Sequence, residues 1–184
     1  MKQKLNRFGF TILEMIVVLS IIGLLLPAVF SLFFSSLRAQ SKVLILQQVK
    51  SNGDNALNVI ESVTRQSGVS LHSDNPPSIT NKVCASNGTT YSAGNIYILD
   101  KNGDWFSFYL NNSAIASESG TIGVQDLTSD KVEITNFPLT CSRSSQTSPP
   151  LISISFTVSQ TGSPGRQEQE ATLNYQTKVK LRSY

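Results

Sequence analysis

The longest apolar run of the sequence lies near its start, over residues 10–34. It holds one charged residue, Glu14, and as a helix it would be about 37 Å long at roughly 1.5 Å per residue. A bilayer core needs about 20 apolar residues, so this segment is long enough to cross a membrane. A secretory signal peptide has a shorter apolar region that ends at a small-residue cleavage site, and no A-x-A follows here. The pattern therefore predicts a retained transmembrane helix over 10–34.

The helical periodicity continues over residues 35–68, now on one side only. Apolar or small residues recur every three or four positions: Leu46, Val49, Gly53, Ala56, Leu57, Ile60 and Val63. Such a stripe is typical of an amphipathic helix that packs on the protein's own sheet. Gly53 weakens its middle by about 1 kcal/mol relative to alanine, and Gly68 fits a C-terminal cap.

Beyond Gly68 the period changes to two, which indicates half-buried antiparallel strands. The expected strands cover residues 79–85, 95–99, 105–110, 131–137, 152–158 and 173–181. Asn102-Gly103 between the second and third is a strong hairpin signal. Residues 141–150 and 162–169 are expected to be loops. The prediction is an α+β fold, with a long N-terminal helix packed on one antiparallel sheet and a β domain over 69–184.

Charge is concentrated at the N-terminus. Lys2, Lys4 and Arg7 account for the whole net charge of +3, and the rest of the chain is neutral. By the positive-inside rule these residues hold the N-terminus in the cytoplasm and place the chain after residue 34 outside. A neutral body has no basic stripe for phosphates, so we predict no nucleic-acid partner. Two cysteines and one histidine cannot form a four-ligand zinc site without carboxylate ligands, which disfavours metalloenzymes and histidine-based hydrolases. We expect no cofactor and no enzyme activity.

The residues at the head of the apolar run form a specific motif. Residues 7–14 read RFGFTILE: a short basic leader ends in Gly9, Phe10 follows, and Glu14 is the fifth residue after the glycine. This string resembles the cleavage and methylation motif of type IV prepilins and of type II secretion pseudopilins. The resemblance covers residues 1 to about 30, and chance rarely produces this order ahead of an apolar run. It implies a pilin-like fold and a filament subunit.

The resemblance implies a role for each motif residue. A prepilin peptidase would cut between Gly9 and Phe10, remove residues 1–9 as a leader, and methylate the new Phe10 amine. Glu14 would align each subunit in the filament by meeting the Phe10 amine of a neighbour. A carboxylate buried among apolar side chains needs such a partner of opposite charge. The implied partners are the peptidase, other pilin or pseudopilin subunits, an inner-membrane assembly platform and membrane lipid.

Pro27 lies inside the apolar helix. Proline has no N–H and clashes with the carbonyl four residues earlier, so we expect a kink or a loosened stretch between Gly23 and Pro27. In many pilins the proline comes one turn later, where this chain has Ser31.

Three interpretations remain open at this stage. The degenerate strand pattern and the end of the chain are similar to minor pilins and to J-type pseudopilins, which favours a minor pilin over a major one. A type II secretion pseudopilin is the first alternative. The second is a single-pass membrane protein whose extracytoplasmic domain binds a partner without forming a filament. All three place the chain in a bacterial inner membrane, and the first two also place it in an extracytoplasmic or cell-surface filament.

Cys84 and Cys141 would face an oxidising compartment with this topology, which favours a disulfide over two free thiols. It would close a loop of about 58 residues and stabilise the fold by roughly 4 kcal/mol in the chain-entropy model.

Two loop motifs are interpreted without a catalytic role. Residues 100–104 read DKNGD, which superficially resembles a calcium loop but lacks the glycine and the glutamate at the positions an EF-hand requires. A hairpin turn is the better interpretation. His72 follows Leu71 in a stretch expected to be a loop, and we expect an exposed histidine there.

Two surfaces are candidates for contacts. Trp105, Phe106, Phe108 and Tyr109 place aromatic rings on both faces of one strand, so one face should be core and the other covered by a loop or exposed for a partner. The basic residues of the last strand, Lys178, Lys180 and Arg182, are expected to form a solvated strand face.

Overall fold

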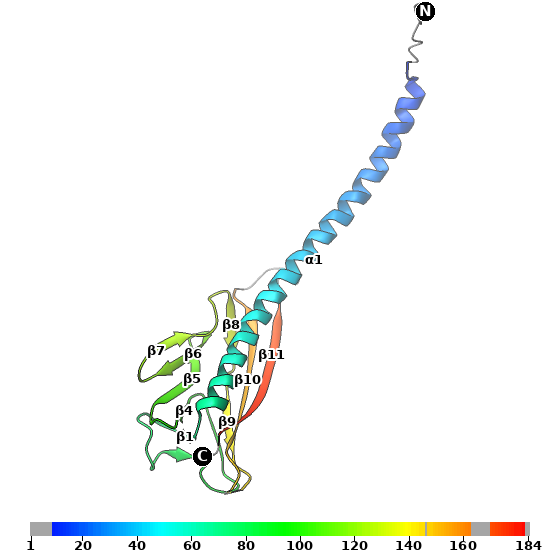
Figure 1. The fold of residues 1–184 in the computed structure, drawn as a ribbon. Helices are drawn as coiled ribbons and strands as arrows, with labels where there is room; N and C mark the ends of the chain where they lie inside the picture. Colours follow the sequence, from blue (N-terminus) through cyan, green and yellow to red (C-terminus); the bar gives the residue numbers. More distant parts are fainter. Residues whose placement is uncertain (1–8, 146, 163–169, 183–184) are drawn as a thin grey trace, which may run out of the picture. The chain divides into compact units, whose positions relative to one another are not determined.

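The computed structural model describes residues 9–145, 147–162 and 170–182. The chain divides into two compact units, Met1–Ser41 and Lys42–Tyr184, and we call the second the β unit. One helix, α1 (Ile12–Ser67), passes from the first into the second and is followed by strands only (Figure 1). The α+β class and the long N-terminal helix are therefore as predicted.

The end of α1 is set by Gly68. Its backbone N–H donates to the Thr64 carbonyl at 3.0 Å and closes the last turn. A Cβ at this position would lie 2.7 Å from the same carbonyl oxygen, so a side chain does not fit without a shift. The Gly68 carbonyl accepts from the Arg182 N–H at 3.1 Å, which ties the helix end to the last described residues of the chain.

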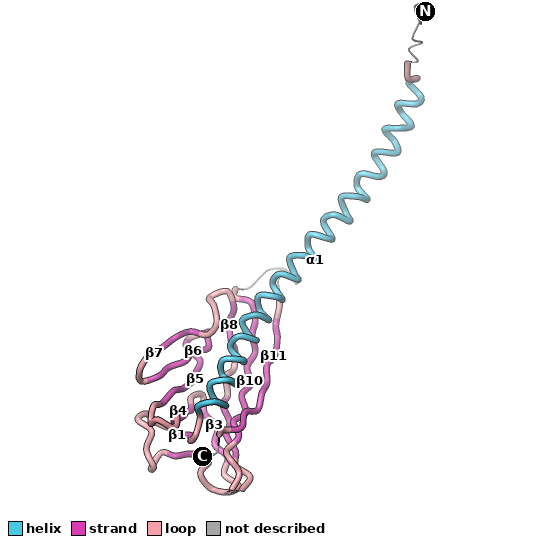
Figure 2. Tube along the Cα trace, in the orientation of Figure 1, coloured by secondary structure: helices cyan, strands magenta, loops and turns pink. Residues whose placement is uncertain are grey.

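Two antiparallel sheets follow the helix, whereas the sequence predicted one (Figure 2). The six-stranded sheet has the order β2 (Lys82–Val83), β1 (Ser70–His72), β4 (Ile96–Leu99), β5 (Trp105–Asn111), β6 (Ala114–Ser119) and β7 (Gly123–Asp126). The five-stranded sheet has the order β11 (Thr172–Lys180), β10 (Leu151–Gln160), β9 (Leu139–Ser142) and β3 (Thr90–Ala93), and β8 (Val132–Thr135) pairs with β10.

The prediction of one sheet was wrong because several strands have weak local signals. β1, β3, β7 and β9 have only three or four residues each, which is too short for a clear period, and β6 contains mostly alanine and serine. The strand expected over 79–85 is reduced to β2, and Cys141 and Ser142, expected in a loop, belong to β9. Of the loop expected over 162–169, all but its first residue lies outside the described residues.

The strands with clean alternation are as predicted. β11 pairs with β10 along its whole length, from Lys180 opposite Leu151 to Thr172 opposite Ser159. Between β4 and β5 the Asn-Gly turn is present, with Gly103 at a φ of +90°, a conformation that L side chains rarely adopt.

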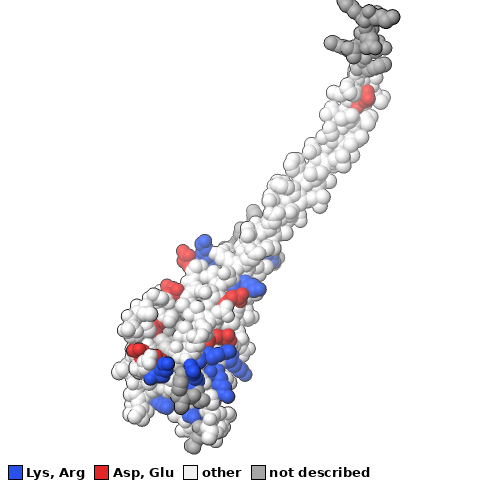
Figure 3. All heavy atoms as spheres, viewed as in Figure 1, with Lys and Arg blue, Asp and Glu red and all other residues white. Residues whose placement is uncertain are grey.

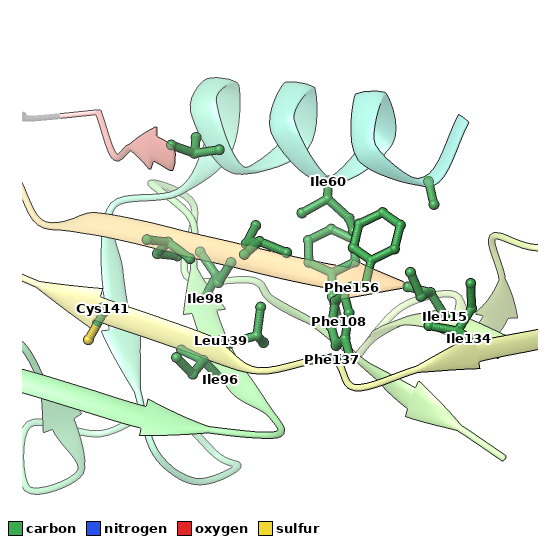
Figure 4. Close-up of a cluster of buried hydrophobic side chains, with 14 of the residues drawn as sticks. Ile60, Ile96, Ile98, Phe108, Ile115, Ile134, Phe137, Leu139, Cys141 and Phe156 are labelled. Atoms are coloured by element: carbon green, nitrogen blue, oxygen red, sulfur yellow. The ribbon is translucent and has the colours of Figure 1, made fainter. Parts of the chain in front are cut away.

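The core lies where the second half of α1 meets both sheets. The buried helix residues are Val49, Gly53, Ala56, Ile60 and Thr64, the first four of which belong to the predicted stripe. Its other members, Leu46, Leu57 and Val63, are half-buried against the core. In Figure 4 Ile60 points from α1 toward Phe156 of β10 and Phe108 of β5, so one side chain contributes to the contact with each sheet. Polar contacts add to it: the Asn52 side chain accepts from the Ser129 N–H at 2.8 Å.

Gly53 allows an aromatic ring to lie directly on the helix backbone. A Cβ built on Gly53 would be 2.2 Å from the Tyr175 ring. That ring cannot easily move, because it stacks on Phe156 with centroids 5.1 Å apart and its hydroxyl donates to the Lys50 carbonyl at 3.1 Å. The glycine that looks unfavourable for a helix is therefore required by packing against β11.

The disulfide joins Cys84 and Cys141, as predicted, with their Cα atoms 6.3 Å apart. Both side chains are buried, and they connect the end of the first short hairpin of the six-stranded sheet to β9 of the other sheet. The bridge therefore links the two sheets covalently at a point away from the helix.

We expect Gly53→Ala to lower stability, although alanine is the better helix former. Overpacking costs about 1–3 kcal/mol, which exceeds the propensity gain of about 1 kcal/mol. In a Tyr175→Ala background the ring is absent, so the same substitution should stabilise. The measurement is urea unfolding of the full chain in detergent micelles, followed by circular dichroism. A stabilising Gly53→Ala in the wild-type background would show that the ring moves away freely.

We also expect stability to fall at alkaline pH through Tyr175. Burial, and then the neighbouring Asp54 carboxylate, raise the pKa of Tyr175 to about 12, above the value of about 10 in an unfolded chain. The contribution is complete below pH ~10 and is lost as the pH rises toward 12, because the unfolded chain releases its proton first. Urea unfolding at pH 9 and pH 11 should show a smaller loss in Tyr175→Phe than in the wild type, with Tyr91→Phe as the control.

Candidate assembly site at the start of the helix

The first part of α1 exposes apolar side chains on all sides. Of its most apolar 18-residue stretch no residue is buried, and the helix is long and apolar enough to cross a membrane. Figure 3 shows this segment as a white surface with one acidic side chain near its start. Glu14 is the only charged residue between positions 8 and 38. Such a surface requires lipid or other apolar helices around it.

Thr11 caps the start of this helix. Its hydroxyl accepts from the Glu14 N–H at 3.3 Å, and its carbonyl accepts from the Met15 N–H at 3.2 Å. Thr11 and Glu14 have the spacing of a capping box, a helix-start signal that the sequence carries in addition to the cleavage motif. A carboxylate in the first turn also interacts favourably with the positive end of the helix dipole. Glu14 therefore stabilises the start of its own helix, in addition to any contact with a partner outside its own chain.

Gly9 and Phe10 precede the helix and are accessible. Phe10 is 77% exposed, and no atom lies within 4 Å of a Cβ built on Gly9. If the chain were cut between them, the new amine would lie one residue before the Thr11 cap. An ammonium there is close to the positive end of the helix dipole, and Glu14 is the charge of opposite sign in the same turn. The basic residues of the expected leader lie in 1–8, outside the described residues.

Pro27 is accommodated within the helix. The helical assignment continues through both Gly23 and Pro27, and a Cβ on Gly23 would meet nothing within 4 Å. The kink or loosened stretch between them stays a prediction.

His72 is not the exposed loop residue that the sequence predicted. It lies in β1, is 3% exposed, and its Nε2 is 2.9 Å from the Ser70 hydroxyl. Its Nδ1 is 2.9 Å from the Ser78 carbonyl and 2.8 Å from Oδ1 of Asn81. The Asn81 side chain in turn binds the backbone of Asp74, Pro76 and Ser78. A buried histidine must be hydrogen-bonded, and here these bonds hold the 73–81 loop in place.

The DKNGD segment is a turn whose carboxylate is used internally. Oδ1 of Asp100 accepts from the N–H of Asn102 at 2.7 Å and of Asp104 at 2.9 Å. These bonds close the hairpin, as predicted. In the described ranges no group of three or more His, Cys, Asp or Glu residues is placed to hold a metal ion.

Comparison with protein-family models, with curated proteins and with solved structures found no match. The architecture alone, a long apolar N-terminal helix packed on antiparallel sheets with a disulfide, is pilin-like.

Proposed function

We propose that this chain is a structural subunit of a type IV pilus-like filament, a minor pilin or a type II secretion pseudopilin. It is held in the bacterial inner membrane until assembly, with the β unit outside. In this proposal it is the substrate of a prepilin peptidase and of an assembly platform, and not a catalyst.

The observation that carries the proposal is the position of the Gly9-Phe10-Glu14 motif on an uncovered helix. The cut site is accessible, the helix begins two residues after it, and no side chain of the following apolar stretch is buried. Lipid covers such a helix before assembly, and neighbouring helices of the same kind cover it in a filament. A plain membrane anchor needs the apolar length but does not need this motif at its head.

Glu14 supports the same proposal. An ionised side chain inside a membrane costs about 3 kcal/mol on insertion scales, and such residues are usually functional. Among the described residues Glu14 has no ion pair within its own chain. The Phe10 amine of a neighbouring subunit, freed by cleavage, would supply the missing cation in a low-dielectric surrounding.

The first test is the native N-terminus. In cells that contain a prepilin peptidase, the recovered chain should begin at N-methylated Phe10, as read by mass spectrometry. Gly9→Leu should block cleavage, because a bulky side chain would stand at the cut position. A native chain that begins at Met1, or beyond Ala28, would contradict the proposal and favour an ordinary anchor or a signal peptide.

The second test separates the charge of Glu14 from its place in the helix start. Glu14→Val should leave membrane insertion and cleavage intact and lower the filament-bound fraction by about tenfold or more, since an unpaired buried ammonium remains in the neighbour. Glu14→Gln should fall between Glu14→Val and the wild type. Both the N-terminus and the filament-bound fraction are measured for each variant.

Two controls accompany that series. Ser20→Val makes a similar polar-to-apolar change in the same helix and should incorporate normally. Thr11→Val removes the cap but keeps the carboxylate, so its effect should be small. Full incorporation of Glu14→Val would mean that the carboxylate only extends to the membrane–water interface and has no role in assembly.

A further inference from the structure

The outer face of the six-stranded sheet carries a row of residues from four neighbouring strands. The register places Tyr97 opposite Ser107, Ser107 opposite Glu118, and Glu118 opposite Val124. Directly opposite residues share a face of a sheet. Phe106 alternates with Ser107 and belongs to the core cluster, so the row lies on the face that points away from the core.

Aromatic rings gather on this outer face. Tyr97 and Trp105 meet edge to face with centroids 5.5 Å apart, and Tyr109 lies opposite Ala116 one row away. The three rings are half-buried, and Ser107 between them is fully buried. Their polar tips, two hydroxyls and the indole N–H, have no hydrogen-bond partner in the part of the chain that the structure describes. These three rings are therefore partly open to a partner on the outer face.

The same face is negatively charged. Glu118 and Asp126 lie beside Tyr109, and the pKa of Tyr109 is raised first by burial and then by the charges of these two carboxylates. Within the described ranges neither carboxylate forms an ion pair, and Asp126 accepts only from the Asn111 amide at 3.3 Å. Aromatic faces next to unpaired carboxylates suit lysine and arginine side chains, which bind to both.

The face ends at an open strand. β7 pairs only with β6, and all four of its residues are exposed. Val124 is 51% exposed and Ile122, at the tip of the hairpin, is 71% exposed. A short exposed edge with aliphatic side chains is a place where another chain can pack.

Cations gather at the opposite edge of the β unit. Arg65 of α1 and Lys178, Lys180 and Arg182 at the end of β11 line one shallow hollow. Arg65, Lys178 and Lys180 are exposed and form no ion pair within the described residues. The Glu61 carboxylate, one turn before Arg65, accepts a hydrogen bond from the Thr177 hydroxyl. Figure 1 shows β7 and β11 on opposite sides of the unit, and in Figure 3 the basic side chains gather near the end of the β unit where α1 stops.

From this complementarity we infer that the outer aromatic face of one subunit binds the basic edge of a second copy of the same chain. The partner is a second copy of the chain, because the basic edge of the chain supplies the lysine and arginine side chains that the acidic aromatic face can bind. The two surfaces differ and lie on opposite sides, so the contact is heterologous and does not close a symmetric dimer. A heterologous contact builds a ring or an open helical chain, and a filament subunit requires the open chain. The inference rests on the proposed function, to which it adds the contact between β units.

Cysteine cross-linking tests the pairing directly. Cys84 and Cys141 are bonded to each other and no other cysteine is present, so introduced cysteines are the only free thiols. One tagged copy of the full chain carries Val124→Cys and a differently tagged copy carries Lys180→Cys, both expressed in cells with a prepilin peptidase. A short bis-maleimide should join the two tags. Ser92→Cys, exposed on β3, replaces Lys180→Cys as the control and should cross-link at least about threefold less.

A charge reversal gives an independent measurement. Glu118→Lys with Asp126→Lys, or Lys178→Glu with Lys180→Glu, should each lower the filament-bound fraction by about threefold or more, and the lowered fraction should recover when both pairs are reversed together. Glu133→Lys, a reversal on β8, is the matched control and should have no effect. Failure of the combined variant to recover would overturn the inference.

The outcomes separate this inference from the proposed function. Chains that begin at Phe10 and enter filaments, but give no Val124–Lys180 cross-link, would overturn only the contact. Cross-links between two Val124→Cys copies would also overturn it, because they indicate a symmetric contact. A chain that begins at Met1 would refute the proposed function, while a cross-link between the two tags in the membrane would still support the contact.

Discussion

The contact between Gly53 and the Tyr175 ring determines how closely α1 lies on the five-stranded sheet. With no Cβ at position 53, the ring occupies the space beside the helix backbone and fills the layer between α1 and β11 together with Phe156. The rest of the helix stripe, with Val49, Ala56 and Ile60, then reaches the core residues of both sheets. A helix held farther away would leave a gap that neither sheet can close, because interiors are packed to near-crystal density.

The helix and the long strands were predictable because their patterns are local. The stripe from Val49 to Ile60 has helical spacing, and β10 and β11 alternate over nine or more residues. The division into two sheets was not, since it depends on short strands such as β6 and β7, whose alanine, serine and glycine residues carry weak preferences. The burial of His72 was missed for a related reason: its partner Asn81 is nine residues away, across a loop that no periodicity describes.

For the candidate site, the motif at Gly9, Phe10 and Glu14 was found through its resemblance to a known cleavage motif, and the apolar length that follows could be read from the residues themselves. The Thr11 cap was also visible in the spacing but acquires meaning only with the observed hydrogen bond to the Glu14 N–H. The outer aromatic face needed the structure, because cross-strand register brings together residues from four strands. Register joins Tyr97 to Val124 over 27 positions of sequence, and no local pattern carries that information.

The disulfide limits how far a pulling force can extend the β unit. Under tension a β domain extends by unravelling, and each released residue adds about 3.4 Å of contour. Cys84 and Cys141 are separated by 57 positions, which as an extended chain would be roughly 190 Å long. The covalent bridge prevents this segment from extending, whichever end of the chain is pulled. The withheld segment includes β4 to β7 of the six-stranded sheet and β3 and β8 of the five-stranded sheet. A force applied through α1 therefore cannot lengthen the segment between Cys84 and Cys141. The strands of the outer aromatic face lie within this segment, so they are not extended when the strands outside it are pulled apart.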